Sequence, residues 1–372
     1  MQFHFLRALE ARLGQAMRIA PVDVPEHFFA KWVSRLFKKL RLPRRYVYYS
    51  EERLDAFARK VEARWTARLA PIVFFGALPF AKCRPVQPYF IYTDSAFFIH
   101  YWEYNQDHTH DGSEIERICA AERDFMRRAA GVWCSSQWVA DRIQNEYGLE
   151  PGKARFVGTG PGDVPPPVQP ITYENFLVMI AADFERKGGR LAAEAVAVAR
   201  RLGCAVSIKF IGARPPADVL ELPFVEWCGW LDLSQQRDRQ RFAQVMSQAG
   251  AQVLLSRVDL TPLAILEAAS YSKATIATAV GGIPEMIEDS MTGFLVRADA
   301  NQKDIADIIV RAFGSNGALA KSGAAARRLF ESRWNWDTVT ERAFRQVRPI
   351  LDPTNSPTAS DSREQVLPNL SF

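Results

Sequence analysis

Two carboxylates flank the start of a predicted helix at residues 262–272. Asp259 and Glu267 are separated by seven residues, and Thr261 and Pro262 lie between them. Thr261 is a good N-cap and proline is favoured at the first helical position, so we expect the helix to begin directly after Thr261. An apolar, strand-like run precedes these residues, which places the helix start at the carboxyl end of a predicted strand.

The first backbone amides of this helix, those of Leu263 and Ala264, have no acceptor within the helix. Together with the helix dipole they favour an anion such as a diphosphate. Glu267 lies one turn after Leu263 on the same face, where a carboxylate can accept two hydrogen bonds from a ribose diol. The alternative interpretation is that Glu267 is an ordinary surface acid on an early helical turn.

Two further motifs follow strand-like runs. Gly281 and Gly282 form a turn in which glycine allows backbone conformations and close ligand approach that other residues block. Arg186 and Lys187 directly precede Gly188 at another predicted helix start, where cations can stabilise a leaving diphosphate. The alternatives are a plain strand–turn–helix connection and a solvated basic turn. The chain contains neither the Walker pattern nor the G-x-G-x-x-G fingerprint.

The second half of the chain resembles the donor-binding domain of retaining GT-B glycosyltransferases of family 4, the glycosyl transferases group 1. The acid-x7-acid motif of that family reads DLTPLAILE here, and EAASYSKATIATAVGGIPEMIEDSMTGFLV continues from its last residue. FERKGG resembles the family's R-K-G element, and VWCSSQWVADRIQNEYG resembles the strand and helix that close its first domain. RWNWDTVTERAFRQV resembles the final helix, which crosses back to the N-terminal domain. The resemblance spans residues 90–350 and is most specific between 250 and 296.

The resemblance implies a role for each matching residue. Glu267 would bind the nucleotide ribose, Asp259 would face the donor sugar, and Lys187 with Arg186 would meet the diphosphate. Asp94 would orient the acceptor and complete a catalytic set with Lys187, Asp259 and Glu267. Neither a metal ion nor a cofactor is implied. The other residues expected to line the donor phosphate and sugar are Gly188, Thr261, Leu263, Ala264, Gly281 and Gly282.

The chain departs from the family's pattern in four places. Asp259 stands where the family usually has glutamate, so its carboxylate is one methylene shorter, and we expect a different donor sugar or lower turnover. Only Arg186 can replace the arginine that often precedes the lysine. Asp94 stands where many members have a histidine, and His100 is the alternative acceptor residue. No Gly-rich loop precedes residue 70, so either the acceptor site is built differently or the start of the chain is missing.

Strand-like and helical runs alternate along both halves of the chain, which predicts the α/β class and parallel sheets. Five prolines and two glycines within residues 160–170 predict a linker. We therefore expect a GT-B architecture, in which two Rossmann-like domains face each other across a cleft and a C-terminal helix crosses back. The expected parts are an N-terminal acceptor-side domain at 1–165, a donor-binding domain at 171–335, a returning helix at 336–352 and a disordered tail at 353–372.

Composition narrows the setting of the protein. Five scattered cysteines without a C-x-x-C pair argue against a disulfide framework, and the start of the sequence lacks the apolar region of a signal peptide. We therefore expect a cytoplasmic protein. The basic, amphipathic segment 31–45 could place it at the inner face of the cell membrane by docking on anionic lipid. The alternative, which is usual for amphipathic helices, is that the apolar stripe packs on its own domain. The chain has no recognised base-reading module, so nucleic acid is not expected as a partner.

The predicted reaction moves a hexose from a UDP- or GDP-sugar to an acceptor hydroxyl with retention of configuration. A glycan or a lipid-linked acceptor is expected, in the assembly of a glycan, polysaccharide or glycolipid. Two other functions stay open at this point. One is a sugar-nucleotide epimerase of the same fold, and the other is a relative that binds a sugar nucleotide with little or no turnover.

Overall fold

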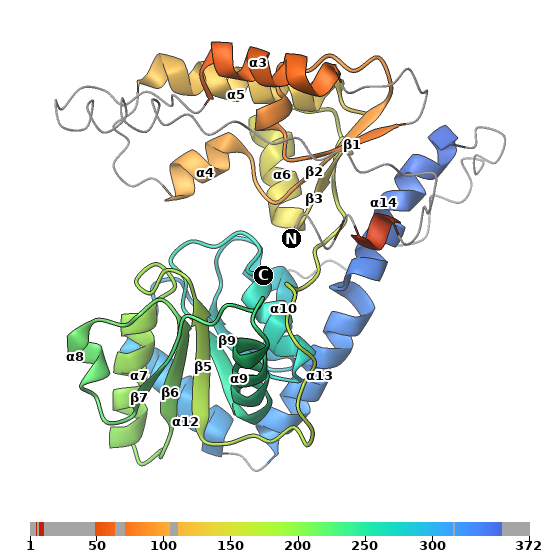
Figure 1. Ribbon diagram of the computed structural model, residues 1–372. Coiled ribbons are helices and arrows are strands. Elements are labelled where there is room, and N and C mark those ends of the chain that lie inside the picture. Colours follow the sequence, from red (N-terminus) through yellow and green to blue (C-terminus); the bar gives the residue numbers. More distant parts are fainter. Residues whose placement is uncertain are drawn as a thin grey trace.

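The computed structural model describes residues 5, 7–10, 49–63, 71–104, 111–314 and 317–351. They form two domains, each built on a parallel sheet flanked by helices, and a long C-terminal helix runs from the second domain to the first (Figure 1). The predicted α/β class and GT-B architecture are confirmed. The basic segment 31–45 and the tail 353–372 lie outside the described residues. None of the helices in the described part of the chain is long and apolar enough to cross a membrane.

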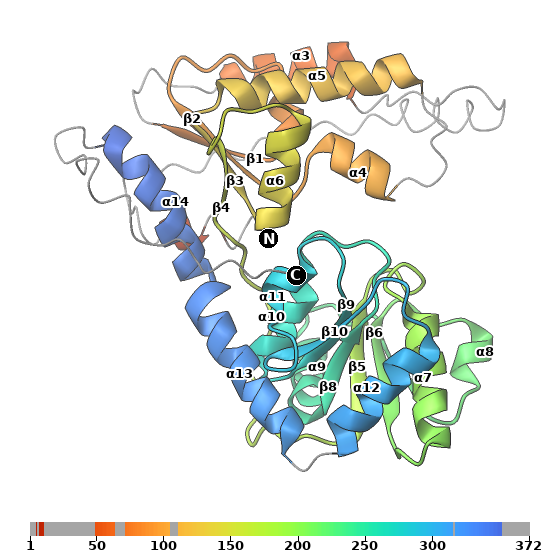
Figure 2. The same ribbon diagram turned by 180° about the vertical axis from the view of Figure 1, so that it is seen from behind.

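The N-terminal domain contains a four-stranded parallel sheet in the order β1-β2-β3-β4. Helices α3, α5 and α6 cover one face of the sheet, and α14 runs along its other side (Figure 2). The elements of this domain are α3 (Glu51–Glu62), β1 (Ile72–Phe75), the 3-10 helix η3 (Leu78–Phe80), β2 (Tyr89–Thr93), α4 (Phe97–Tyr104), α5 (Gly112–Arg128), β3 (Gly131–Cys134), α6 (Gln137–Glu146) and β4 (Ala154–Phe156).

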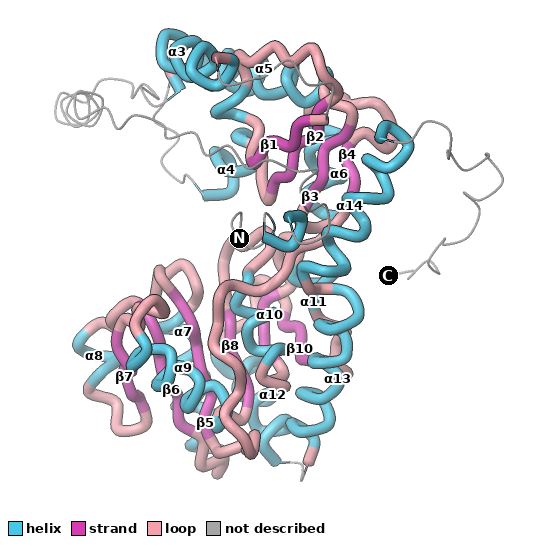
Figure 3. Tube along the Cα trace, turned by 45° about the vertical axis from the view of Figure 1, so that its right-hand side comes forward, coloured by secondary structure: helices cyan, strands magenta, loops and turns pink. Residues whose placement is uncertain are grey.

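The C-terminal domain contains a six-stranded parallel sheet in the order β10-β9-β8-β5-β6-β7 (Figure 3). Helices α7 and α12 cover one face, and α9 and α10 cover the other. Its elements are β5 (Phe176–Ala181), α7 (Gly189–Arg201), β6 (Ser207–Gly212), α8 (Ala217–Leu220), β7 (Val225–Gly229), α9 (Gln236–Gln248), β8 (Ala251–Leu254), α10 (Leu263–Ser270), β9 (Thr275–Thr278), α11 (Ile283–Met286), β10 (Gly293–Val296), α12 (Gln302–Gly314) and α13 (Ala318–Arg333).

The strand order of this sheet reverses at the central strand β5. This strand reads FLVMIA, a continuous apolar run, because helices cover both of its faces. β5 pairs with β6 on one side and with β8 on the other, so the strand order reverses between β5 and β8. In open parallel sheets this reversal leaves a crevice at the carboxyl ends of the strands, where ligands bind.

The last helix, α14 (Trp336–Leu351), ties the two domains together. Val339, Ala343 and Val347 pack against aromatic side chains of the N-terminal sheet, including Trp133. The indole Nε1–H of Trp133 donates a hydrogen bond to Gln346 Oε1 at 3.1 Å. This face of α14 is apolar because it replaces solvent on the sheet, as the resemblance to the family's final helix implied.

The predicted alternation of strands and helices is present in both domains. Elements that were not predicted individually include the helices α4, α8, α12 and α13 and the strand β10. α4 reads FFIHYWEY, and bulky aromatic residues are poorer helix formers than leucine or alanine. Its helical state follows from tertiary packing, because Phe97, Phe98, Ile99 and Tyr101 are all buried in the N-terminal core.

Candidate functional site

Two loops of the C-terminal domain emerge side by side at the reversal of strand order. One follows β5 and contains Arg186 and Lys187, and the other follows β8. Their backbones bind each other: the Leu255 amide donates to the Lys187 carbonyl, and the Arg257 amide donates to the Arg186 carbonyl, both at 3.1 Å. The two cations are thereby fixed beside the segment that carries Asp259.

Glycines make the close contact of these loops possible. Gly188 has φ of +75°, and a Cβ there would lie 2.2 Å from the carbonyl oxygen of Leu255. Gly281 has φ of +54°, and a Cβ would lie 2.0 Å from the carbonyl oxygen of Asp259. The Gly282 amide donates to the Leu260 carbonyl at 2.8 Å. Gly188 and Gly281, which we predicted beside the donor, are therefore required because a Cβ at either position would clash with the backbone of a neighbouring loop.

Lys187 and Asp259 form an ion pair at the centre of this arrangement. The Lys187 ammonium donates to Asp259 Oδ2, and the side chains are 13% and 9% exposed. The Ser256 hydroxyl donates to the same carboxylate oxygen at 2.9 Å. A cation and an anion held this close can bind opposite parts of a ligand, a phosphate on the lysine and sugar hydroxyls on the aspartate.

Arg186 reaches toward the other domain. Its Nη1 donates to the Val258 carbonyl at 3.0 Å, and its side chain pairs with Asp183 at 3.4 Å. Its guanidinium also lies over the ring of Tyr104, 5.4 Å from the centroid, at the end of α4 in the N-terminal domain. A cation over an aromatic face is attracted by the ring quadrupole. Arg186 therefore links the donor side of the predicted site to the acceptor side.

The helix α10 begins one residue later than predicted. Pro262 is its N-cap, with φ −72° and ψ 115°, and Leu263 is its first residue. The assignment of Thr261 as N-cap is wrong, because the extended Pro262 moves the threonine out of reach of the helix. The Thr261 hydroxyl instead forms a 2.9 Å hydrogen bond with the Ser135 hydroxyl of the N-terminal domain. Leu263 and Ala264 are half-buried at the helix start.

Glu267 lies against the linker between the domains. The Gly162 amide lies beside its carboxylate, and a Cβ on Gly162 would lie 2.7 Å from Glu267 Oε1. Burial raises the pKa of Glu267 to about 7, against the effects of the Gly162 amide and the nearby Lys187. The carboxylate is therefore poised to change its charge near neutral pH, and it lies within electrostatic range of the Lys187 ammonium.

The N-terminal domain contributes Asp94 and the helix α4 that follows it. Asp94 and His100 are exposed, yet desolvation raises the pKa of the Asp94 carboxyl and lowers that of the His100 imidazole, and each opposes the shift of the other. His100 stacks on Tyr104 with ring centroids 5.2 Å apart. The Leu260 amide lies close enough to the Tyr104 hydroxyl to oppose the rise in its pKa. Desolvation and then Asp259 raise the pKa of Tyr104 to about 12, so the phenol is neutral.

A buried carboxylate holds α4 in place. Glu122 Oε2 accepts hydrogen bonds from the Phe97 amide at 2.7 Å and from the Tyr147 hydroxyl at 2.6 Å. Burial raises the pKa of Glu122 to about 7, against the effects of these two donors. The bond to Phe97 satisfies an amide in the first turn of α4, which has no acceptor inside the helix. Glu122 thus determines where the helix carrying His100 and Tyr104 begins.

The structure therefore brings the sequence-predicted residues of the donor side together, whereas Asp94 lies in the N-terminal domain within electrostatic range of His100 and Tyr104. Sequence reasoning missed Tyr104 and Ser256, both of which contact this group, and gave no role to Ser135 or Glu285. Ser256 lies only three residues before Asp259, and this short spacing could have indicated a hydrogen bond between the two side chains. Nothing in the sequence near Tyr104 indicates its contact with Arg186, because the two are joined only by the meeting of the domains.

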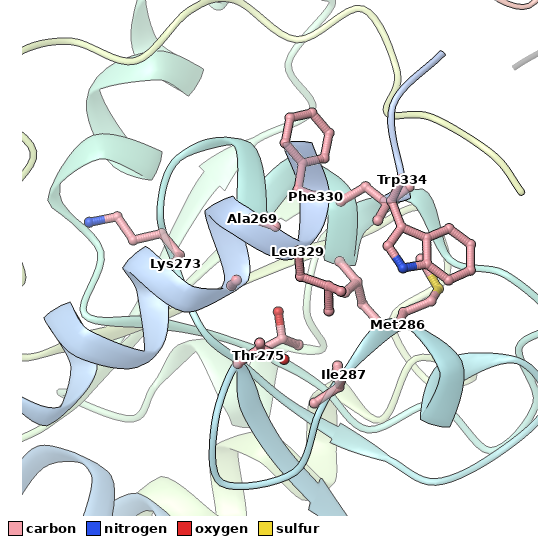
Figure 4. Close-up of a pocket in the computed structure, with 12 residues that line it drawn as sticks. Ala269, Lys273, Thr275, Met286, Ile287, Leu329, Phe330 and Trp334 are labelled. Atoms are coloured by element: carbon pink, nitrogen blue, oxygen red, sulfur yellow. The ribbon is translucent and has the colours of Figure 1, made fainter. Parts of the chain in front are cut away.

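A small cavity behind α10 is separate from this site (Figure 4). It lies between α10 and α13, on the face of α10 opposite to Glu267. The Lys273 ammonium points away from it and donates to the Ser247 carbonyl at 2.9 Å. The cavity is a space in the packing of the core, lined mainly by the apolar side chains of Ile265, Leu266, Ala269, Met286, Ile287, Ala326, Leu329, Phe330 and Trp334.

Part of the chain matches a known sequence family. Residues 175–315 match the sequence model of the family described as Glycosyl transferases group 1. The alpha-maltose-1-phosphate synthase of Mycolicibacterium smegmatis is 24% identical over 255 residues, which cover 62% of this chain and 65% of that protein. The chain thus spans less than two thirds of the length of the curated relatives that it matches.

Solved structures of low sequence identity share the fold. Sucrose-phosphate synthase from Thermosynechococcus elongatus superposes with a TM-score of 0.64 at 16% identity, covering 82% of this chain and 79% of that one. Anabaena HepE in complex with UDP gives a TM-score of 0.60 at 13% identity, covering 80% and 82%. Together with the family match, these structures confirm the resemblance to the GT-B glycosyltransferases.

Proposed function

We propose that the protein is a retaining glycosyltransferase that transfers a hexose from a UDP- or GDP-sugar to an acceptor hydroxyl. The observation that carries the proposal is the meeting of three loops, after β5, β8 and β9, at the carboxyl ends of parallel strands. These loops hold Lys187, Asp259 and the paired glycines beside the start of α10. The structure of the similar protein HepE was solved in complex with UDP, which supports a nucleotide as a ligand of this fold.

On the donor side, each residue has a distinct task in this proposal. Lys187 and Arg186 stabilise the negative charge that develops on the leaving diphosphate. The amides of Leu263 and Ala264 bind the same group at the start of α10. Asp259 accepts hydrogen bonds from the donor sugar, and Glu267 accepts them from the ribose diol. Donor binding then replaces part of the direct contact between Lys187 and Asp259.

The chemical step follows from this arrangement. The acceptor hydroxyl attacks the anomeric carbon from the face on which the diphosphate leaves. The bond from the anomeric carbon to the diphosphate oxygen breaks, the glycosidic bond forms, and the acceptor proton passes to the diphosphate. Asp94 orients the acceptor hydroxyl. No covalent bond to the protein forms, and the anomeric configuration is kept.

The acceptor in this proposal is a glycan or a lipid-linked sugar, and the enzyme works in glycan, polysaccharide or glycolipid assembly. The protein is cytoplasmic and docks through residues 31–45 on the anionic inner face of the cell membrane. Flotation with vesicles of anionic lipid, compared with vesicles of neutral lipid, tests this docking. Equal recovery with both kinds of vesicle would remove the membrane from the proposal.

Calorimetry with UDP and GDP tests the donor site first. We expect one nucleotide to bind the wild-type protein and to bind Glu267→Ala at least tenfold more weakly, because the ribose loses its acceptor. A screen of labelled nucleotide sugars then identifies the hexose, and NMR of the product gives the anomeric configuration. Binding of neither nucleotide would overturn the proposal. Isomerisation of the sugar without an acceptor would indicate an epimerase, and binding without turnover would indicate a non-catalytic relative.

A further inference from the structure

The glutamate of the Gly-Gly-Ile-Pro-Glu turn reaches across to the N-terminal domain. Glu285 lies in α11, directly after the paired glycines. Its Oε2 accepts a hydrogen bond from the Gln137 amide at 2.7 Å, and its Oε1 accepts one from the Trp138 amide at 2.6 Å. Both amides belong to the first turn of α6. A residue of the C-terminal domain therefore caps a helix of the N-terminal domain.

The cap by Glu285 adds to the local cap of α6 and binds different amides. The Ser136 hydroxyl, at the N-cap, accepts a bond from the Val139 amide at 3.2 Å and leaves the two preceding amides to Glu285. A carboxylate at a helix N-terminus interacts favourably with the helix dipole, and its hydrogen bonds are charge-assisted. Because Glu285 is only half-buried, its two bonds join the domains without burying an unpaired charge.

Other contacts surround this cap and lead directly to the proposed donor loops. A Cβ on Gly282 would lie 2.8 Å from the Ser136 Cβ, so the glycine turn touches the start of α6. The Ser135 and Thr261 hydroxyls bind each other at 2.9 Å. The Leu260 side chain packs into the hydrophobic core of the N-terminal domain. The cap on α6 and the loop that holds Asp259 are therefore parts of one interdomain contact.

We propose that Glu285 is a positioning residue that holds the two domains together through the N-terminus of α6. We call this arrangement, in which the domains are in contact as in this structure, the closed arrangement. Glu285 thereby sets the distance between the donor loops and the acceptor side, where Asp94 and Tyr104 lie. The effect on catalysis rests on the proposed function, whereas the docking of the domains does not. Glu285 itself need not touch either substrate.

The start of α6 offers a matched pair of variants for the test. Gln137→Pro removes one of the two amides that Glu285 binds, and proline is favoured at the first position of a helix. The preceding Ser136 has φ −140° and ψ 160°, the extended conformation that a residue before proline prefers. Gln137→Ala is the control, because it removes the same side chain, with its 2.7 Å bond to Asp141, but keeps the amide.

Variants at Glu285 complete the design. Glu285→Gln keeps the shape of the side chain, but it removes the charge and one of the two acceptor oxygens. Glu288→Gln makes the same change at a nearby exposed acid and serves as its control. Melting temperatures of all four variants show whether each folds. The double variant Glu285→Gln with Gln137→Pro tests whether the two changes act on one interaction, in which case their effects are less than additive.

Hydrogen–deuterium exchange and small-angle scattering measure the docking without any substrate. In Glu285→Gln we expect the Trp138 amide to exchange about tenfold faster and the radius of gyration to increase, because the closed arrangement is less populated. Gln137→Pro should show the same expansion, whereas Gln137→Ala and Glu288→Gln should behave like the wild type. Unchanged exchange and scattering in both Glu285→Gln and Gln137→Pro would overturn the proposal.

Catalytic measurements then test the consequence. We expect Glu285→Gln and Gln137→Pro each to lower kcat/KM for transfer about tenfold, with the affinity for the free nucleotide changed less than twofold, because the nucleotide contacts the C-terminal domain. A loss of activity without expansion would contradict the positioning role. If no nucleotide sugar is a substrate, the proposed function fails, and exchange and scattering still decide the role of Glu285.

Discussion

The two sides of the proposed site are built in different ways. On the donor side, three loops bind each other through backbone atoms, and glycines with positive φ leave no space for a side chain. On the acceptor side, one aromatic helix, α4, carries His100 and Tyr104 and is held at its start by Glu122. A site fixed by backbone contacts leaves a readable motif in the sequence, whereas a site fixed by side-chain packing does not.

The largest effect should come from the cation at the centre of the donor side. Lys187→Ala removes the ammonium that we propose stabilises the leaving diphosphate, and we expect kcat/KM to fall at least about 100-fold. Lys209→Ala removes a lysine of the same domain that pairs with Glu226 at 3.1 Å, away from the site, and should leave kcat/KM unchanged. Wild-type turnover in Lys187→Ala, with the fold confirmed by circular dichroism, would refute the assignment.

Glycine variants compare the two domains directly. Gly188 and Gly76 have nearly the same φ, +75° and +78°, but a Cβ on Gly76 would have no atom within 4 Å. We expect Gly76→Ala to lower the free energy of unfolding by about 1 kcal/mol from backbone strain alone. Gly188→Ala adds a clash with the Leu255 carbonyl and should cost about 3 kcal/mol. Equal losses in urea unfolding would show that the donor loops are less tightly packed than described.

Two buried carboxylates with raised pKa values, one on each side of the proposed site, should make the stability of the protein depend on pH. Glu267 and Glu122 both have a pKa of about 7, above the unfolded value of about 4.3. The folded protein therefore binds more protons than the unfolded chain between these values, and each group's contribution to stability decreases as the pH rises from about 4.3 to 7. Replacing either by glutamine should make the free energy of unfolding depend less on pH in this window.

Of these two carboxylates, only Glu267 should change the affinity for the nucleotide. Its ionised form accepts the ribose hydrogen bonds, so the affinity for the donor nucleotide sugar should rise about tenfold from pH 6 to pH 8 as the ionised fraction increases. Titration calorimetry of Glu267→Gln should show little of this rise, and that of Glu122→Gln should show all of it. A rise that persists in Glu267→Gln would assign the pH dependence to another group.

The smallest effect should come from the contact between the two sides. Tyr104→Phe removes the hydroxyl that lies near the Leu260 amide but keeps the ring under Arg186. We expect kcat/KM to fall about fivefold in this variant, as for the loss of one polar contact, and further in Tyr104→Ala, which also removes the cation–π contact. Identical losses in both variants would show that the ring adds nothing to the position of Arg186.

The residues of the proposed donor side could be singled out from the sequence because their signals are local. The spacing of Asp259 and Glu267, the basic pair before Gly188 and the paired glycines after a strand-like run all lie within short segments. The parallel sheet then brings these segments together, since each follows the carboxyl end of a strand. The one local error, Thr261 as N-cap, arose because Pro262 adopts an extended conformation and shifts the helix start by a residue.

The acceptor side was less predictable for a physical reason. The aromatic sequence of α4 has no strong helical preference, and its conformation depends on burial and on Glu122, 25 residues from Phe97. Glu285 was visible in the sequence, but its partners are the backbone amides of residues 137 and 138, which any residue except proline would supply. A side chain that binds a backbone amide therefore leaves no motif at the position of that amide, unlike the close backbone contacts that require glycine on the donor side.

The sequence by itself determined the alternation of strands and helices, the linker and the chemistry available at each strand end, because these depend on periodicity and on the conformational limits of glycine and proline. Only the tertiary structure decided which groups meet across the two domains and how burial changes the charge of Glu267. Those properties depend on the distance between segments far apart in the chain, such as Glu285 and the amide 148 residues before it. The electrostatic interaction and the solvation of a group depend on how close such segments lie, and the local sequence does not determine that distance.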